Sequence, residues 1–103
     1  LITEEGAFQV IVRGTREGKP LKITSYVNSP GLVEAYKTAG ISHEAYLTGQ
    51  SAFIFTKMMV KDAVTQKGCI SPEVLDAAPR KFFFNEAAKL GITFDEIIEK
   101  SLA

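Results

Sequence analysis

A chain of 103 residues, of which 46% are hydrophobic and 23% charged, has the length and composition of one globular domain. Lys plus Arg and Asp plus Glu number 12 each, and this zero net charge argues against a nucleic-acid binder, which would normally carry a basic excess. The lack of an apolar run of about 18 residues excludes a transmembrane helix. The single cysteine, Cys69, excludes an internal disulfide framework and fits a reducing compartment such as the cytoplasm. Because the sequence opens at Leu1 directly before a strand pattern, we expect a fragment of a longer protein.

Two segments near the N-terminus, residues 7–13 and 21–27, alternate apolar and polar side chains as half-buried strands do. Their apolar faces consist of Phe8, Val10 and Val12 in the first segment and Leu21, Ile23 and Val27 in the second. Between them, Gly18 can adopt the positive φ that a tight reversal needs. We therefore predict a β-hairpin with one buried and one wetter face. It needs further strands or a covering helix, because two strands alone are marginally stable.

The stretch from Gly49 to Val64 predicts a helix of about four turns, with Thr48 as its N-cap. Apolar residues fill more than half of its circumference, whereas a surface helix needs only a stripe of roughly 100°. These residues are Ala52, Phe53, Phe55, Met59, Val60, Ala63 and Val64. A narrower polar stripe runs from Gln50 to Thr65 and is interrupted by Ile54 and Met58. We expect this helix to lie in the middle of the structure, with a second partner on its far side.

Two short helical segments are predicted on either side of this helix. Ser29 followed by Pro30 is an N-cap and first-turn signal for a helix over residues 32–37, ended by Gly40. Residues 41–47 are ambiguous, and Ser42 could cap a turn there. Pro72 follows Ser71 with the same signal and predicts a short turn through residue 75.

The C-terminal third predicts two more helices. The first covers residues 80–90 and ends at Gly91. The residues Thr93-Phe94-Asp95-Glu96 match a capping box and predict a last helix after a possible short strand at Ile92. The sum is an α+β fold: a small, mainly antiparallel sheet built on the N-terminal hairpin, with a long central helix and further C-terminal helices packed on one face.

Motifs for catalysis and metal binding are absent: the sequence contains no GxGxxG, Walker A, HExxH, CxxC or GxSxG pattern. His43 and Glu44 would point about 100° apart on a helix, so they make a poor chelate and no metal site is predicted. We favour a His43 side chain that has its hydrogen bonds satisfied or is exposed to solvent. The alternative is a role in substrate binding or proton transfer. Cys69 is interpreted as an inert small residue. Lys57 and Lys61 are interpreted as the solvent-exposed edge of the predicted helix, and the alternative is that they form a carboxylate-binding pair.

The segment Thr48-Gly49-Gln50-Ser51 is the more promising candidate site. At the start of the predicted helix it would offer free backbone N–H groups, which favour anions. A substrate carboxylate could bind there, and the alternative, which the residues alone favour, is a plain N-cap without a ligand.

The order of these motifs resembles the C-terminal domain of the saccharopine dehydrogenase and lysine dehydrogenase family. The matching features are a V-x-V-x-G-x-x-x-G-K hairpin over residues 10–19, Thr48-Gly49 before a helix with Met58-Met59 in its middle, the loop from Lys67-Gly68 to Pro72-Glu73, and Leu90-Gly91-Ile92 at a helix end. They cover most of the chain in the same order.

The resemblance implies a substrate-binding and dimerisation domain of an NAD(P)-dependent oxidoreductase, as in lysine metabolism. Such enzymes pass a hydride between nicotinamide and a carbon attached to nitrogen in an amino acid or amino-acid adduct. By match to the family's Thr-Gly segment, Thr48, Gly49 and Gln50 carry over as substrate-binding residues, and His43 is added for its place just before them. NAD(P) would bind a Rossmann domain elsewhere in the parent chain, because the Gly-rich fingerprint is missing here. The resemblance assigns no catalytic residue and implies that this domain alone is inactive.

Two other hypotheses remain open. The chain could be a stand-alone homodimeric interaction module, with the long helix and the patch Phe82–Phe84 as its dimer surface. It could also be a small-ligand-binding module that uses the Thr48-Gly49 end of the helix.

Overall fold

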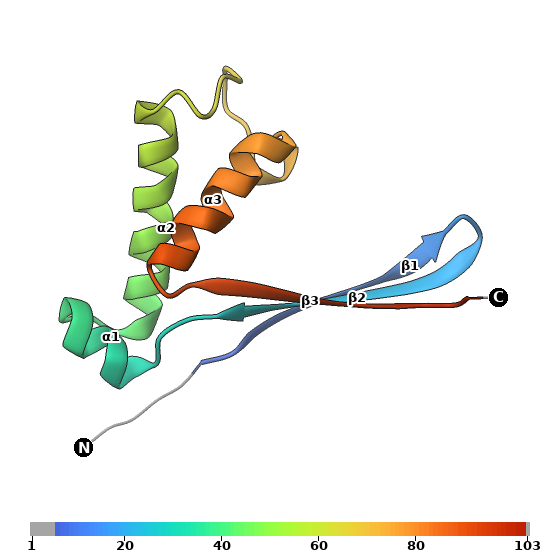
Figure 1. Cartoon of the computed structure of the whole chain (residues 1–103), viewed down its shortest axis with the longest axis horizontal. Coiled ribbons are helices and arrows are strands. Elements are labelled where there is room, and N and C mark those ends of the chain that lie inside the picture. Colours follow the sequence, from blue (N-terminus) through green and yellow to red (C-terminus); the bar gives the residue numbers. More distant parts are fainter. Residues whose placement is uncertain (1–5, 103) are drawn as a thin grey trace.

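Three antiparallel strands form the sheet in the spatial order β1-β2-β3, so that β2 lies in the centre. A computed structural model of the chain describes residues 6–102. The strands are β1 (Phe8–Arg16), β2 (Lys19–Asn28) and β3 (Thr93–Lys100). Between β2 and β3 the chain forms α1 (Leu32–Ala39), α2 (His43–Val60), the short 3₁₀ turn η1 (Pro72–Val74) and α3 (Ala77–Lys89). The predicted α+β class, with its N-terminal hairpin and long central helix, is confirmed (Figure 1).

The predicted hairpin is present and is longer than expected. Arg16 pairs with Lys19, which leaves only Glu17 and Gly18 in the turn. Both turn residues have positive φ, 53° and 76°, and such two-residue turns match the right-handed twist of the strands that they join. The role predicted for Gly18 is confirmed.

Residues 93–100 form β3, so the helix predicted there is wrong. Thr93 and Glu96 match the capping box, but this segment pairs with β2, and the Asp95 carboxylate accepts a 2.7 Å hydrogen bond from the Asn28 side chain. Without β3 the outer edge of β2 would leave a row of backbone N–H and C=O groups without partners. Ile97 and Ile98 are β-branched strand formers, but the apolar residues Phe94, Ile97 and Ile98 have the spacing of a helix, so the local pattern does not indicate the strand. Long-range pairing therefore prevails over the local cap signal.

The register places most of the apolar strand residues on one face, because directly opposed residues in a sheet point to the same side. We call this the apolar face; its residues are Phe8, Val10, Val12, Leu21, Ile23, Ser25, Val27, Phe94, Glu96 and Ile98, with Arg16, Lys19 and Lys100 at the hairpin end. The opposite face is mostly polar and carries Gln9, Ile11, Arg13, Lys22, Thr24, Tyr26, Asp95, Ile97 and Glu99. The faces predicted for the two hairpin strands are thus correct.

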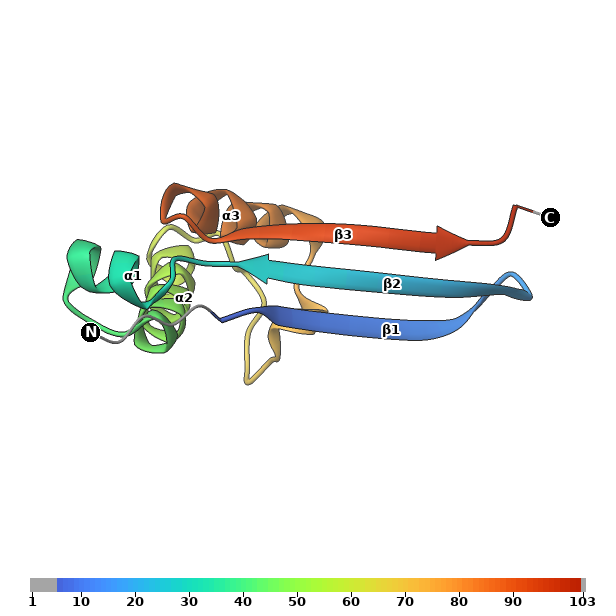
Figure 2. The same ribbon diagram turned by 90° about the horizontal axis from the view of Figure 1, so that it is seen from below.

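The helices cover only one end of the apolar face. Phe94 of β3 contacts Phe83 and Phe84 of α3, with ring centroids 6.3 Å and 4.9 Å apart. Beyond this contact the sheet extends away from the helices, so the molecule has a helical arm and a sheet arm that meet at a corner (Figures 1 and 2). Val10 and Val12 are each 57% exposed. The expectation that this face is buried is therefore wrong for most of its length.

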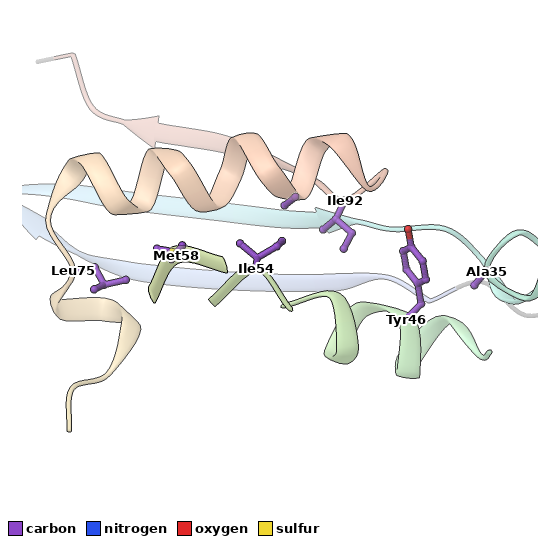
Figure 3. Close-up of a cluster of buried hydrophobic side chains, with 7 residues drawn as sticks. Ala35, Tyr46, Ile54, Met58, Leu75 and Ile92 are labelled. Atoms are coloured by element: carbon purple, nitrogen blue, oxygen red, sulfur yellow. The ribbon is translucent and has the colours of Figure 1, made fainter. Parts of the chain in front are cut away.

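The core lies among the helices and the start of β3 (Figure 3). Its buried residues are Ala35, Tyr46, Ile54, Met58, Leu75, Ala87 and Ile92. The Tyr46 hydroxyl donates a 2.8 Å hydrogen bond to the Leu90 carbonyl oxygen and so ties α2 to the end of α3. The core is small for a chain of this length, because the sheet arm contributes little to it.

Helix α2 packs through the side that the helical wheel marked as polar. Ile54 and Met58, which interrupt the predicted polar stripe, are fully buried, whereas Phe53 is 54% exposed. Lys57 lies on the same side but reaches Glu86 of α3 with its ammonium group, so its alkyl chain covers apolar surface while its charge is paired. The expected second partner for the apolar far side is not found within the described residues.

The helix boundaries also differ from the predictions. Helix α2 begins at His43, six residues before the predicted Gly49, and its N-cap is Ser42, whose hydroxyl accepts a 3.2 Å hydrogen bond from the Ala45 N–H. The cap of α1 is Gly31 rather than Ser29, while Gly40 ends that helix as predicted, with φ of 72°. Helix α3 begins at Ala77, earlier than the predicted residue 80.

The burial of α2 predicts opposite outcomes for two neighbouring truncations. Ile54→Ala should lower the free energy of unfolding by about 2–5 kcal/mol, because it opens a cavity in a well-packed core. Phe53→Ala, on the outer side of the same helix turn, should cost about 1 kcal/mol or less. Urea unfolding followed by circular dichroism measures both. A larger loss for Phe53→Ala would contradict this packing.

Candidate functional site

The four predicted substrate residues lie on α2, on two different sides of the helix. His43 is buried and Gln50, two turns further along, is half-buried on the same side. Thr48 and Gly49 are exposed on the outer side. The structure therefore does not bring the four residues together into one site.

The Thr48-Gly49 segment lies in the interior of α2, so its backbone N–H groups take part in the helix ladder. The free N–H groups of a helix belong to its first turn, which here starts at His43. Thr48, Gly49 and Gln50 therefore have no free backbone N–H groups with which to bind an anion, and the predicted anion site at this segment is wrong. Their substrate role, carried over from the family resemblance, stays a prediction.

His43 is the buried ionisable side chain of this segment. It is 6% exposed, and its Nδ1 atom is buried without a hydrogen-bond partner among residues 6–102. The backbone of Gly6 approaches the ring so closely that a Cβ atom there would lie 3.3 Å from Nε2. The interpretation of His43 as satisfied or exposed is therefore wrong within the described residues. Nδ1 has a free hydrogen-bonding position for a small polar group.

An ion-pair network joins α2 to α3. The Lys57 ammonium lies 2.6 Å from Glu86 Oε2, and Lys89 lies 2.8 Å from Glu86 Oε1. Hydrogen bonds from Lys57 and then Lys89 lower the pKa of the Glu86 carboxyl from its ordinary 4.5 to about 2. Lys57 is thus part of the packing between two helices rather than a solvated edge, while Lys61 is the exposed C-cap of α2. The sequence shows the Glu86–Lys89 spacing but not the tertiary partner Lys57.

A hollow of about 640 Å³ lies at the corner between the two arms, and we call it the corner hollow. It is lined by Phe55, Pro72, Glu73, Leu75, Arg80, Phe83, Phe84 and Glu96. Arg80 is partly engaged, since it donates a 2.6 Å hydrogen bond to the Glu73 backbone carbonyl. A hydrogen bond with the Ser71 side chain lowers the pKa of the Glu73 carboxyl. The hollow thus combines aromatic walls with two carboxylates and one guanidinium.

The patch Phe82–Phe84, predicted as part of a dimer surface, is divided between the core and the corner hollow. Phe82 and Phe83 pack against the core, and Phe83 lies 5.0 Å from Phe55 between ring centroids. Phe84 is exposed at the corner hollow, where its ring is available to a further partner.

A second, smaller hollow of about 450 Å³ lies on the apolar face at the hairpin end of the sheet. Three of its lining residues are basic, namely Arg16, Lys19 and Lys100, and one, Glu17, is acidic. The hairpin end therefore carries positive charge, whereas the corner hollow carries a small excess of negative charge.

A metal-binding cluster does not occur in the described part of the chain. No group of three His, Cys, Asp or Glu side chains among residues 6–102 could hold a metal ion. Cys69 is a free, exposed thiol in the loop after α2. None of the helices described between residues 6 and 102 is long and apolar enough to cross a bilayer. The described strands all pair antiparallel, whereas the βαβ unit that carries a Gly-rich nucleotide loop joins parallel strands.

Comparison with protein-family models, with curated proteins and with solved structures found no match to this chain. The functional argument therefore depends on the residues and surfaces described above.

The Glu86 network predicts a pH dependence of stability. Because the folded-state pKa of Glu86 lies below the unfolded value, its stabilisation is complete above about pH 4.5 and is lost as the pH falls towards about 2. Glu86→Gln should flatten the decline of the unfolding free energy over this interval. Glu99→Gln is the control, since the Glu99 carboxylate is exposed and lies 3.8 Å from Lys22. An equal flattening by both variants would contradict the assignment to Glu86.

Gly49 gives a separate test of the predicted substrate segment. A Cβ atom at this interior helix position would meet nothing within 4 Å. Gly49→Ala should therefore raise the free energy of unfolding by about 0.5–1 kcal/mol, measured by urea denaturation. If Gly49 also contacts substrate, the variant should weaken binding of lysine, glutamate or a saccharopine-like acid in a calorimetric titration of the parent protein. Unchanged affinity would remove Gly49 from the substrate site.

Proposed function

We propose that this chain is the substrate-binding and dimerisation domain of a saccharopine dehydrogenase-like, NAD(P)-dependent oxidoreductase acting on an amino acid or amino-acid adduct, and that it is inactive alone. The observation that carries this proposal is the open apolar face of the sheet. A domain that completes its own fold has no reason to leave such a face in water, whereas a domain of a larger assembly does.

The amount of exposed surface supports an assembly role. The accessible surface is 7783 Å², while a compact monomer of 11.2 kDa exposes about 5,700 Å². The radius of gyration is 16.6 Å, against about 13 Å for a compact domain of this length. The difference in area, roughly 2,000 Å², is larger than the roughly 800 Å² that each partner buries in a standard interface.

The outer side of α2 supports a second contact. Phe53, Met59 and Val60 are exposed there, next to the small residues Gly49 and Ala52, which allow close approach of another element. The family resemblance supplies a candidate for that element, namely the Rossmann domain of the parent chain. Under this proposal Thr48 and Gly49 face the domain boundary, where substrates of two-domain enzymes bind.

The division of chemistry between domains fits the same proposal. The described residues contain His43 with a free Nδ1 atom and no assembled catalytic group. A substrate domain needs to contribute binding groups, while the nicotinamide chemistry belongs to the partner domain. We therefore keep His43, Thr48, Gly49 and Gln50 as candidate substrate-binding residues and place NAD(P) in the parent protein.

A stand-alone homodimeric interaction module is the second candidate function. The open apolar face favours it equally, because that face needs a partner of some kind. The parent reading frame discriminates between the two candidates.

The reading frame tests the proposed function. We expect the residues encoded before Leu1 to contain a βαβ unit with the GxGxxG fingerprint, identified by sequencing the parent gene. We also expect the purified parent protein to reduce NAD(P) with lysine or a saccharopine-like substrate, measured by nicotinamide absorbance. A reading frame without a nucleotide-binding unit would overturn the oxidoreductase assignment and leave the interaction module.

A further inference from the structure

We propose that a second copy of this chain covers the apolar face, packed face to face and antiparallel, so that the hairpin end of each copy lies in the corner hollow of the other. This inference rests on the proposed function as a dimerisation domain and adds the partner surface and its orientation. It is carried by the register of the sheet, by the distribution of charge along the face and by the exposed area.

The centre of the proposed contact is one cross-strand row. Val12 pairs with Ile23, which pairs with Ile98, so the three side chains form an apolar line across the sheet. A two-fold axis lying over this row stacks each strand on its own copy in the opposite direction. The row then packs against itself at the usual distance of about 10 Å between stacked sheets.

The charges on β3 are arranged symmetrically about this centre. Glu96 lies two residues before Ile98 on the corner side, and Lys100 lies two residues after it on the hairpin side. The two-fold axis therefore places Glu96 of one copy opposite Lys100 of the other, and repeats this pair at the symmetry-related position. Opposite charges thus meet on both sides of Ile98, at the β3 end of the apolar row.

The same operation brings the hairpin end to the corner hollow. Leu102, four residues beyond Ile98 and 92% exposed, comes to the level of Phe94 in the other copy, next to the exposed ring of Phe84. The basic residues Arg16 and Lys19 then approach the carboxylates of the corner hollow. The helical arm limits how far the second copy can slide, so the two corners define the position of the complex.

The opposite face of the sheet is a poorer contact surface. Its polar groups already satisfy each other across the strands: Gln9 donates to the Tyr26 hydroxyl at 3.1 Å, Asn28 donates to Asp95, and Lys22 pairs with Glu99. Burying these groups under a partner would cost desolvation, and only Ile11 and Ile97 would add sizeable aliphatic contact. The apolar face has no such network, and the excess exposed area noted above is sufficient for one interface of ordinary size.

Two neighbouring isoleucines test which face is used. Ile97 and Ile98 are 50% and 52% exposed and point to opposite faces of the same strand. By analytical ultracentrifugation of the full chain we expect the unmodified protein to dimerise. Ile98→Asp should raise the dimer Kd on the order of 100-fold or more, because each dimer buries two unpaired charges. Ile97→Asp should change the Kd less than about threefold. A monomeric unmodified chain, or a stronger effect of Ile97→Asp, would overturn the proposal.

A charge exchange between copies tests the antiparallel orientation and does not depend on the apolar variants folding. Glu96→Lys alone and Lys100→Glu alone each create like-charge contacts and should weaken dimerisation about tenfold or more. An equimolar mixture of the two variants restores opposite charges at both positions and should form heterodimers with a Kd within about threefold of the unmodified value. Circular dichroism confirms that each variant is folded. Failure of the mixture to recover would overturn the antiparallel arrangement.

The self-pairing and the proposed oxidoreductase function can fail independently of each other. A chain that stays monomeric but whose parent gene encodes the nucleotide-binding unit would refute the self-pairing and leave the oxidoreductase assignment intact. A dimer with the predicted variant pattern from a gene without that unit would support the self-pairing and remove the oxidoreductase assignment.

Discussion

The pairing of β3 with β2 is the contact on which the rest of the structure depends. It joins residues 93–100 to residues 21–28, near the other end of the chain, and so closes the whole polypeptide into one unit. Because β3 follows α3 after only a short connection, this pairing also brings the rings of Phe83 and Phe84 onto Phe94. The helical arm is therefore attached to the sheet through β2, which leads into α1, and through β3, which follows α3, and both connections lie at the same end of the sheet.

This attachment explains why the domain has an unusual distribution of apolar surface. The helices form the core among themselves, around Ile54 and Met58, and reach the sheet only at its Phe94 end. The remaining length of the apolar face has no cover within the described residues, although its alternation is as regular as that of a buried strand pair. We propose that a partner covers this regular apolar surface and that the charges at the two ends of the face set the orientation of the partner.

The polar groups of the chain that have chemical potential lie in different parts of the fold. His43, whose Nδ1 atom has no hydrogen-bond partner among residues 6–102, is the first residue of α2, whereas the corner hollow with its aromatic walls and charged groups is lined by residues from Phe55 onward. Lys57 and Glu86, which have the shortest ion-pair contact, join α2 and α3 and act on stability. This ion pair is separate from the surfaces proposed to meet partners, whereas Phe55, Leu75 and Phe83 both pack in or against the core and line the corner hollow.

The sequence by itself determined the elements whose signals are local. The conformational freedom of glycine and period-two alternation depend on near neighbours along the chain. They predict the hairpin with its turn at Gly18, the end of α1 at Gly40, the faces of the hairpin strands and the α+β class.

Only the tertiary structure decided the rest. It turned the apparent capping box at Thr93 into a strand, extended α2 back to His43 and chose Ile54 and Met58 rather than Phe53 and Val60 as its buried side. A helix with apolar residues on most of its circumference can bury either side, and a short segment with mixed signals can form either element. The choice is made by the distant residues that supply hydrogen-bond partners and packing, and no local pattern contains that information.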